Sequence, residues 1–178
     1  MNAQPANFRS RVDYTNGVAP TAEYGQHFFQ GAPIKRNLMD PIIDHIEITV
    51  ADMAVAVPFY DKMLPLLGFD LRHRSAAVID AHEKHVVSYE HPRLGFAITS
   101  PRSAVAAEKI NRRKPGSLHH LAFKAASRAE VDRLHTELEA IGAAIVTPPR
   151  EYPEYTPAGY YALFFKDPEG IKYEIVSY

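Results

Sequence analysis

Two segments of the chain are imperfect copies of each other. The first reads DHIEITVAD over residues 44–52, and the second reads HHLAFKAAS over residues 119–127. Each copy places a histidine, His45 or His120, at the head of an alternating run and a helix-capping residue seven positions later. Internal repetition predicts a duplicated architecture. Here it puts two imidazoles at equivalent points of two units, an arrangement that favours a metal site in a pseudo-symmetric fold.

The elements predicted around these copies follow the same order in both units. In the first, a strand over residues 42–50 precedes a helix that Asp52 caps and Gly68 ends, and short strands are expected around residues 69–74, 86–89 and 95–99. In the second, a strand over residues 118–125 precedes a helix that runs from the capping box of Ser127 and Glu130 to Gly142. Strands then follow over residues 143–147, 160–166 and 171–178. The pattern predicts an α+β fold in which two βαβββ modules form a curved, half-open mixed β-barrel with the helices outside.

The two predicted helices differ in regularity. The second carries a clear buried stripe at helical spacing, formed by Val131, Leu134, Leu138 and Ile141. The first has its apolar positions at Val55, Phe59, Met63, Leu64 and Leu67. It also contains two prolines, Pro58 and Pro65, which fit poorly inside a helix. We therefore expect a kink or a late start at one proline and an early end at the other.

Composition excludes several classes of function. The chain has 178 residues, a formal net charge of -1 and no cysteine. The charge argues against a nucleic-acid partner, and without thiolates any metal must be held by histidine and carboxylate side chains. No apolar run reaches membrane-spanning length and the N-terminus lacks the apolar stretch of a signal peptide. We therefore expect a cytoplasmic protein with no membrane partner.

The chain divides near residue 40. Residues 1–40 show neither a strand nor a helix period, which predicts an extension that is either flexible or packs as an arm on the domain or on a second subunit. The second alternative rests on aromatic residues that are apolar for a free tail: Phe8, Tyr14, Tyr24, Phe28 and Phe29. Residues 41–178 are expected to form the domain, with modules over about residues 42–101 and 117–178.

Three motifs of this domain resemble a known superfamily. They are FYDKML followed by LGF over residues 59–69, GSLHHLAF over residues 116–123, and YYALFFKDPEGIKYE over residues 160–174. In this order and at this spacing they resemble the first helix, the fifth strand and the last hairpin of the vicinal oxygen chelate superfamily. That superfamily includes glyoxalase I, bleomycin-resistance proteins, fosfomycin-resistance enzymes and extradiol dioxygenases. The resemblance covers about residues 42–178 and implies the same half-open barrel.

The resemblance also implies a set of metal ligands. The sequence Asp167-Pro168-Glu169-Gly170 is suited to a type I turn. Alternation alone would place Glu174, four residues past this turn's last residue, toward solvent, whereas the resemblance implies that it binds metal. His45 and His120 are the implied partners of Glu174. His119 shares a face with Leu121 and Phe123, so we interpret it as a structural residue that packs toward the helix.

The first module departs from the superfamily pattern. A fourth ligand, Glu or Gln, is expected near residue 99, where the sequence reads FAIT over residues 96–99. Glu47 lies on the face of His45 but roughly 7 Å along the strand, so we expect it to support a ligand or to face the substrate. Two histidines and one carboxylate leave coordination positions open for a divalent ion, which could be Fe, Mn, Ni, Co or Zn.

These features lead to two functional hypotheses. The first is a metal-dependent enzyme that acts on a small substrate with two adjacent oxygens, as a lyase or isomerase or as a ring-cleaving dioxygenase. Glu174, Tyr160 and Glu47 are then the candidate catalytic residues. Tyr160 lies in a group with Tyr152, Tyr155 and Tyr161 that could equally be a solvent-shielding loop. The alternative is a metal-free, bleomycin-resistance-like protein that binds a small molecule. In either case we expect a homodimer.

Overall fold

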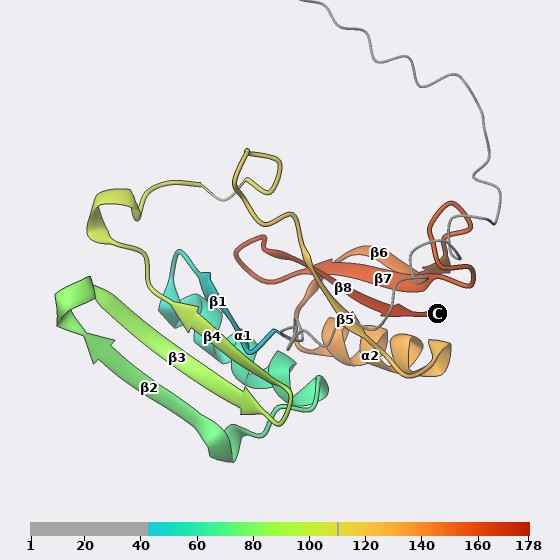
Figure 1. Ribbon diagram of the computed structural model, residues 1–178, viewed down its shortest axis with the longest axis horizontal. Helices are drawn as coiled ribbons and strands as arrows, with labels where there is room; N and C mark the ends of the chain where they lie inside the picture. The colour runs from blue at the N-terminus through green and yellow to red at the C-terminus, as the bar shows by residue number, and fades with distance from the viewer. Residues whose placement is uncertain (1–42, 110) are drawn as a thin grey trace, which may run out of the picture. The chain divides into compact units, whose positions relative to one another are not determined.

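The computed structural model describes residues 43–109 and 111–178. Its elements form two modules with the same order (Figure 1). The first contains β1 (His45–Thr49), α1 (Met53–Leu66), β2 (Arg74–Ile79), β3 (Lys84–His91) and β4 (Leu94–Thr99). The second contains β5 (Leu121–Lys124), α2 (Arg128–Ala140), β6 (Ala144–Glu151), β7 (Tyr161–Lys166) and β8 (Lys172–Ser177). The two alternatives for residues 1–40 lie outside the described residues.

Each module folds its four strands into one mixed sheet. The strand orders are β1-β4-β3-β2 and β5-β8-β7-β6, so the first and last strands of each module are neighbours. These neighbours run parallel, and the remaining pairs run antiparallel. The two sheets do not close on each other. The structure therefore confirms the predicted fold class of two βαβββ modules in a half-open mixed barrel.

Helix α1 begins where its cap predicts. The Asp52 carboxylate accepts a hydrogen bond from the Ala54 N–H at 2.7 Å, and the helix starts at Met53. Both prolines lie inside the helix, so the expected late start is wrong, and the end falls one residue after Pro65. The buried face is formed by Ala56, Phe59, Tyr60, Met63 and Leu64. Val55 was expected on that face and is instead 47% exposed.

The strand expected at residues 69–74 lies later in the chain. A 3-10 turn occupies Leu71–His73, and β2 begins only at Arg74. The cause is local, because the Asp70 carboxylate accepts from the backbone N–H of Arg72 at 2.9 Å and also binds its guanidinium. Such side-chain to backbone bonds compete with strand pairing.

The second helix agrees with its predicted capping box. Ser127 Oγ accepts from the Glu130 N–H at 3.2 Å, and the Glu130 carboxylate accepts from the Ala126 N–H at 2.6 Å. Val131, Leu134 and Leu138 are buried. The chain leaves the helix through Gly142, whose φ of 89° is a left-handed conformation that glycine adopts without strain. Of the helices that the structure describes, neither is long and apolar enough to span a membrane.

A buried polar network joins the two modules. The predicted turn is present, with a 3.1 Å hydrogen bond from the Gly170 N–H to the Asp167 carbonyl. The hydroxyl of Tyr60 on α1 donates to the Asp167 carboxylate at 2.8 Å and lies 2.7 Å from the Tyr173 hydroxyl on β8. The Glu169 carboxylate accepts from the backbone N–H groups at residues 51 and 52, just before α1. The turn thus anchors the end of the second module to the helix of the first.

Candidate functional site

The centre of the candidate site is the carboxylate of Glu174 on β8. It is 2% exposed, and its ladder partners are Ala122 on β5 and Phe164 on β7. Its Oε2 lies 3.0 Å from Nε2 of His120, and its Oε1 accepts a hydrogen bond from the Tyr160 hydroxyl at 2.6 Å. Burial and the neighbouring carboxylate raise the pKa of Tyr160, which keeps that hydroxyl protonated as a donor.

His120 stands immediately before β5 at the edge of this buried group. Its side chain is 31% exposed, and its ring meets Phe164 edge-on. Its Nδ1 lies 2.7 Å from Nδ1 of His119, so one of these nitrogens must carry the hydrogen. Both contacts of His120 are satisfied when its Nε2 donates to Glu174 and its Nδ1 accepts from His119.

The interpretation of His119 as a packed structural residue is wrong. His119 is exposed and its ring contacts that of His120. The strand begins only at Leu121, so the alternation of β5 does not extend back to His119. Partial desolvation, followed by the charges of His120 and Lys172, lowers the pKa of His119.

His45 begins β1 and lines a cavity that His120 also lines. The cavity has a volume of about 800 Å³ and is lined by both His45 and His120, together with Glu47 and Lys172. The imidazole of His45 is 66% exposed and binds Asp44 through Nδ1 at 2.8 Å. Its ladder partner is Gly95, where an added Cβ would lie 3.0 Å from the His45 Cβ, so a side chain at this position would crowd His45.

The strand registers explain the missing fourth ligand. Glu47 pairs with Ala97 on β4, and Ala122 pairs with Glu174 on β8. Because Glu47 follows His45 by two residues and Ala122 follows His120 by two, the counterpart of Glu174 is Ala97. Each module thus has one carboxylate on this pair of strands, on β1 in the first and on β8 in the second. Glu47 forms an ion pair with Lys84 on β3.

The aromatic group around Tyr160 is only partly as predicted. Tyr152 and Tyr155 stack with ring centres 5.0 Å apart, and both meet Tyr160 edge-on. Tyr161 faces away, and its hydroxyl donates to Asp132 on α2. The contact of Phe164 with His120 was not anticipated. The alternation of β7 could have identified it, since Phe164 occupies the same face as its ladder partner Glu174.

A match to a family model decides which superfamily the chain belongs to. The model of the Glyoxalase/Bleomycin resistance protein/Dioxygenase superfamily matches residues 42–175. This chain belongs to that superfamily. The resemblance stated from the three motifs is therefore confirmed.

Individual proteins are similar to this chain over most of its length. The uncharacterized protein YqjT of Bacillus subtilis is 29% identical over 133 residues, which cover 75% of this chain and 96% of YqjT. A provisionally assigned glyoxalase from Bacillus halodurans is 29% identical, with a TM-score of 0.61 over 78% of this chain and 96% of its own. A superfamily domain from Frankia sp. EAN1pec is 23% identical, with a TM-score of 0.61 over 76% of this chain and 95% of its own; it shows the fold alone.

The superfamily commonly binds metal ions, so the donors must be tested against one. Two donor atoms that each lie about 2.1 Å from an ion, with an angle of about 90° at the ion, are roughly 3 Å apart. The 3.0 Å between His120 Nε2 and Glu174 Oε2 fits this spacing. Nitrogen and carboxylate donors suit a divalent ion. Within residues 43–109 and 111–178, no three His, Asp or Glu side chains gather closely enough to hold a metal. His120 and Glu174 are therefore in contact, and His45 lines the cavity that His120 also lines, whereas Glu174 is not among its lining residues.

Proposed function

We propose that this protein is a metal-dependent enzyme of the superfamily that acts on a small substrate with two adjacent oxygens. His45, His120 and Glu174 would hold one divalent ion, either Fe, Mn, Ni, Co or Zn. The observation that supports this most is the Glu174 carboxylate, which is 2% exposed, contacts His120 at 3.0 Å and is oriented by Tyr160. A carboxylate is costly to bury without a strong partner, and a cation would be such a partner.

The residues around this set have separable roles. A bound ion would supply Lewis acidity, which would serve a lyase or isomerase as well as a ring-cleaving dioxygenase. Tyr160 acts as a positioning residue, since its hydroxyl fixes the orientation of Glu174. Glu47 lines the cavity and forms an ion pair with Lys84. Its place in the cavity makes this carboxylate the candidate group to accept a proton from the substrate.

Metal content tests this proposal directly. Protein purified without an affinity tag is assayed for bound elements and for thermal stabilisation by Mn, Fe, Co, Ni and Zn. We expect stabilisation by at least one of these ions, and its loss in Glu174→Gln and in His45→Ala. His73→Ala is the control, because His73 is exposed and lies in the 3-10 turn before β2. A wild type that contains no metal and gains no stability from any of the five ions would overturn the proposal.

A metal-free binding protein is the second candidate. It is supported by the partners of Glu174, because both of its oxygens already contact protein donors among the described residues. The cavity would then hold a small molecule without transforming it. Failure of every metal in the preceding experiment, combined with ligand-induced stabilisation that survives a chelator, would favour this function over the first.

We also propose that the protein forms a homodimer through β2. This strand is the outer edge of the first sheet (Figure 1), and its Val78 is 61% exposed. The equivalent edge, β6, contains Pro148 and Pro149 and two register shifts, which block further strand pairing. β2 has no such protection, and a two-fold axis would pair it antiparallel with its copy.

Light scattering after size-exclusion chromatography tests this interface. Val78→Lys should convert the dimer to a monomer, because a lysine on an edge strand opposes pairing. Val146→Lys is the matched control on β6, where Val146 is 47% exposed, and it should leave the dimer intact. A monomeric wild type at micromolar concentration would contradict the proposal.

A further inference from the structure

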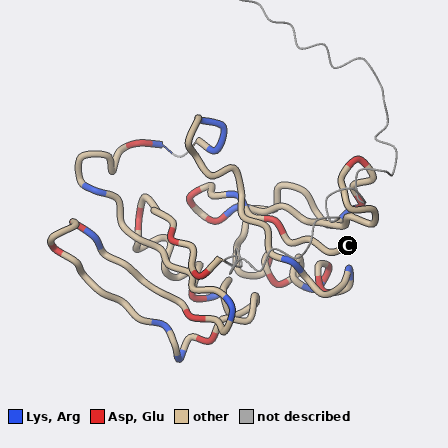
Figure 2. Tube along the Cα trace, in the orientation of Figure 1, with Lys and Arg blue, Asp and Glu red and all other residues tan. Residues whose placement is uncertain are grey.

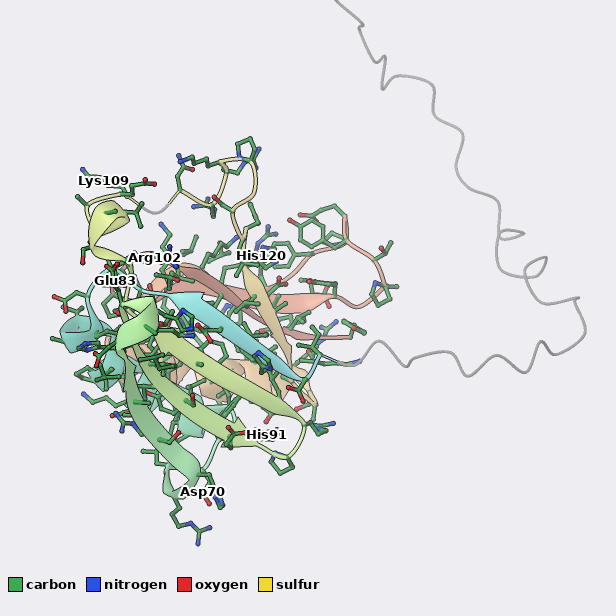
Figure 3. All side chains as sticks on the ribbon, turned by 60° about the vertical axis from the view of Figure 1, so that its left-hand side comes forward. Asp70, Glu83, His91, Arg102, Lys109 and His120 are labelled. Atoms are coloured by element: carbon green, nitrogen blue, oxygen red, sulfur yellow. The ribbon has the colours of Figure 1, made fainter. Side chains whose placement is uncertain are left out.

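The cavity shared by His45 and His120 carries more positive than negative charge. Its basic lining residues are Lys109, Arg112, Lys114 and Lys172 and its acidic ones are Glu47 and Glu108. Both carboxylates have basic partners, since Glu47 binds Lys84 and Glu108 lies 4.0 Å from Lys114. Most of the basic residues come from the connection between β4 and β5, where Figure 2 shows Lys and Arg gathered. Figure 3 labels Lys109 in this connection and His120 at its end.

Three of these four cations, Lys109 among them, have no carboxylate within 4.0 Å among the described residues, and only Lys114 has one. Among the residues that the structure describes, neither Arg112 nor Lys172 forms an ion pair within 4.0 Å. The Nε of Arg112 is buried and has no hydrogen-bond partner in the same part of the chain. A buried charged donor left unpaired is costly, so such a group favours an anionic ligand.

Lys172 connects this charge to the candidate metal site. Its Nζ lies 3.9 Å from the centre of the Phe164 ring, and the same ring meets His120 edge-on with centres 6.0 Å apart. A ligand that reaches Lys172 is therefore close to His120. The chain as a whole has a net charge of -1, so this positive charge is local and suits a small anion better than a polyanion.

We propose that the substrate carries an anionic group, a carboxylate or a phosphate, which Arg112 and Lys172 bind at the cavity beside His120. Arg112 supplies a planar fork that can bind two oxygens, and Lys172 supplies a point charge. The inference rests on the proposed function for the assignment of this cavity as the substrate site. It adds that the reacting end of the substrate faces the histidines while its anionic end faces the β4–β5 connection.

Calorimetric titration of the full chain in the presence of a chelator tests this inference apart from metal binding. Inorganic phosphate and acetate are the two probes, and the variants are Arg112→Gln and Lys172→Gln. Arg113→Gln is the matched control, because Arg113 is the next residue in the same connection and does not line the cavity. We expect one of the probes to bind, and the affinity to fall roughly tenfold or more in Arg112→Gln and several-fold in Lys172→Gln. Arg113→Gln should stay within about twofold of the wild type.

Each outcome has a defined meaning. Preference for phosphate or for acetate assigns the anionic group of the substrate. The inference is overturned if neither probe binds below about 10 mM, or if Arg112→Gln and Arg113→Gln weaken binding equally. Thermal unfolding of each variant shows whether it is folded, and Lys172→Gln provides the test if Arg112→Gln is not. Anion binding without any metal binding would contradict the proposed function alone, and metal binding without anion binding would contradict this inference alone.

Discussion

Removal of the Tyr160 hydroxyl should measure how much its hydrogen bond to Glu174 contributes to the stability of the protein. Tyr160→Phe deletes the donor that lies 2.6 Å from Glu174 Oε1 and keeps the ring that packs on Tyr152 and Tyr155. A hydrogen bond to a charged group contributes about 1.5–3 kcal/mol, and Glu174 is too buried for water to replace it fully. We expect a loss of roughly 2 kcal/mol in the free energy of unfolding, or about 4–8 °C in Tm for a chain of this size.

Urea denaturation followed by circular dichroism gives this free energy for the metal-free protein. Tyr155→Phe is the matched control, since it makes the same change in the same aromatic group. Tyr155 is 45% exposed, and its hydroxyl makes no hydrogen bond to any residue that the structure describes. The control should change the free energy by less than about 0.5 kcal/mol. Equal effects of the two substitutions would show that Tyr160 acts through packing, and the positioning role would be wrong.

Three further substitutions test other parts of the structure. Burial raises the pKa of Asp167. This group therefore stabilises the folded protein at low pH, and its contribution is lost as pH rises through the raised pKa. In urea titrations, the free energy of unfolding of Asp167→Asn should depend less on pH above about pH 4 than that of the wild type. Gly95→Ala should displace His45 and destabilise the protein by about 1–3 kcal/mol, measured by thermal unfolding, and an unchanged Tm would contradict the close approach. Ser127→Ala should cost about 1 kcal/mol, and a loss below about 0.3 kcal/mol would contradict its capping bond to Glu130.

Local signals in the sequence predicted most of the fold. Asp52 and Ser127 cap their helices because capping depends on contacts within a few residues. The position of β2 was missed because its run of small residues, Ser75 to Ala77, is exposed on both faces and does not alternate. The 3-10 turn at Asp70 added to the error, since it depends on a side-chain contact that hydrophobic periodicity does not report.

The candidate site could be predicted only in part. The repeat identified His45 and His120, and the motif resemblance added Glu174. The contact between Glu174 and Tyr160 depends on the tertiary packing of β7 and β8, and the pairing of Glu47 with Ala97 depends on the register of β1 and β4. Neither the pairing of β7 with β8 nor that of β1 with β4 can be read from the sequence of one strand alone. The pair of Arg112 and Lys172 was missed because the two lie sixty positions apart in the chain. Arg112 lies in no recognised motif, and the motif that contains Lys172 was interpreted only for its turn and for Glu174.

The number of Mn(II) ions bound per chain tests the central claim most directly. Electron paramagnetic resonance reports the free ion during titration of protein purified without an affinity tag, for the wild type and for Glu174→Gln. We predict one tight site per chain in the wild type and an affinity at least about tenfold lower in the variant, because the buried carboxylate would be a ligand. No bound ion in the wild type, or equal affinity in both proteins, would contradict a metal site at Glu174.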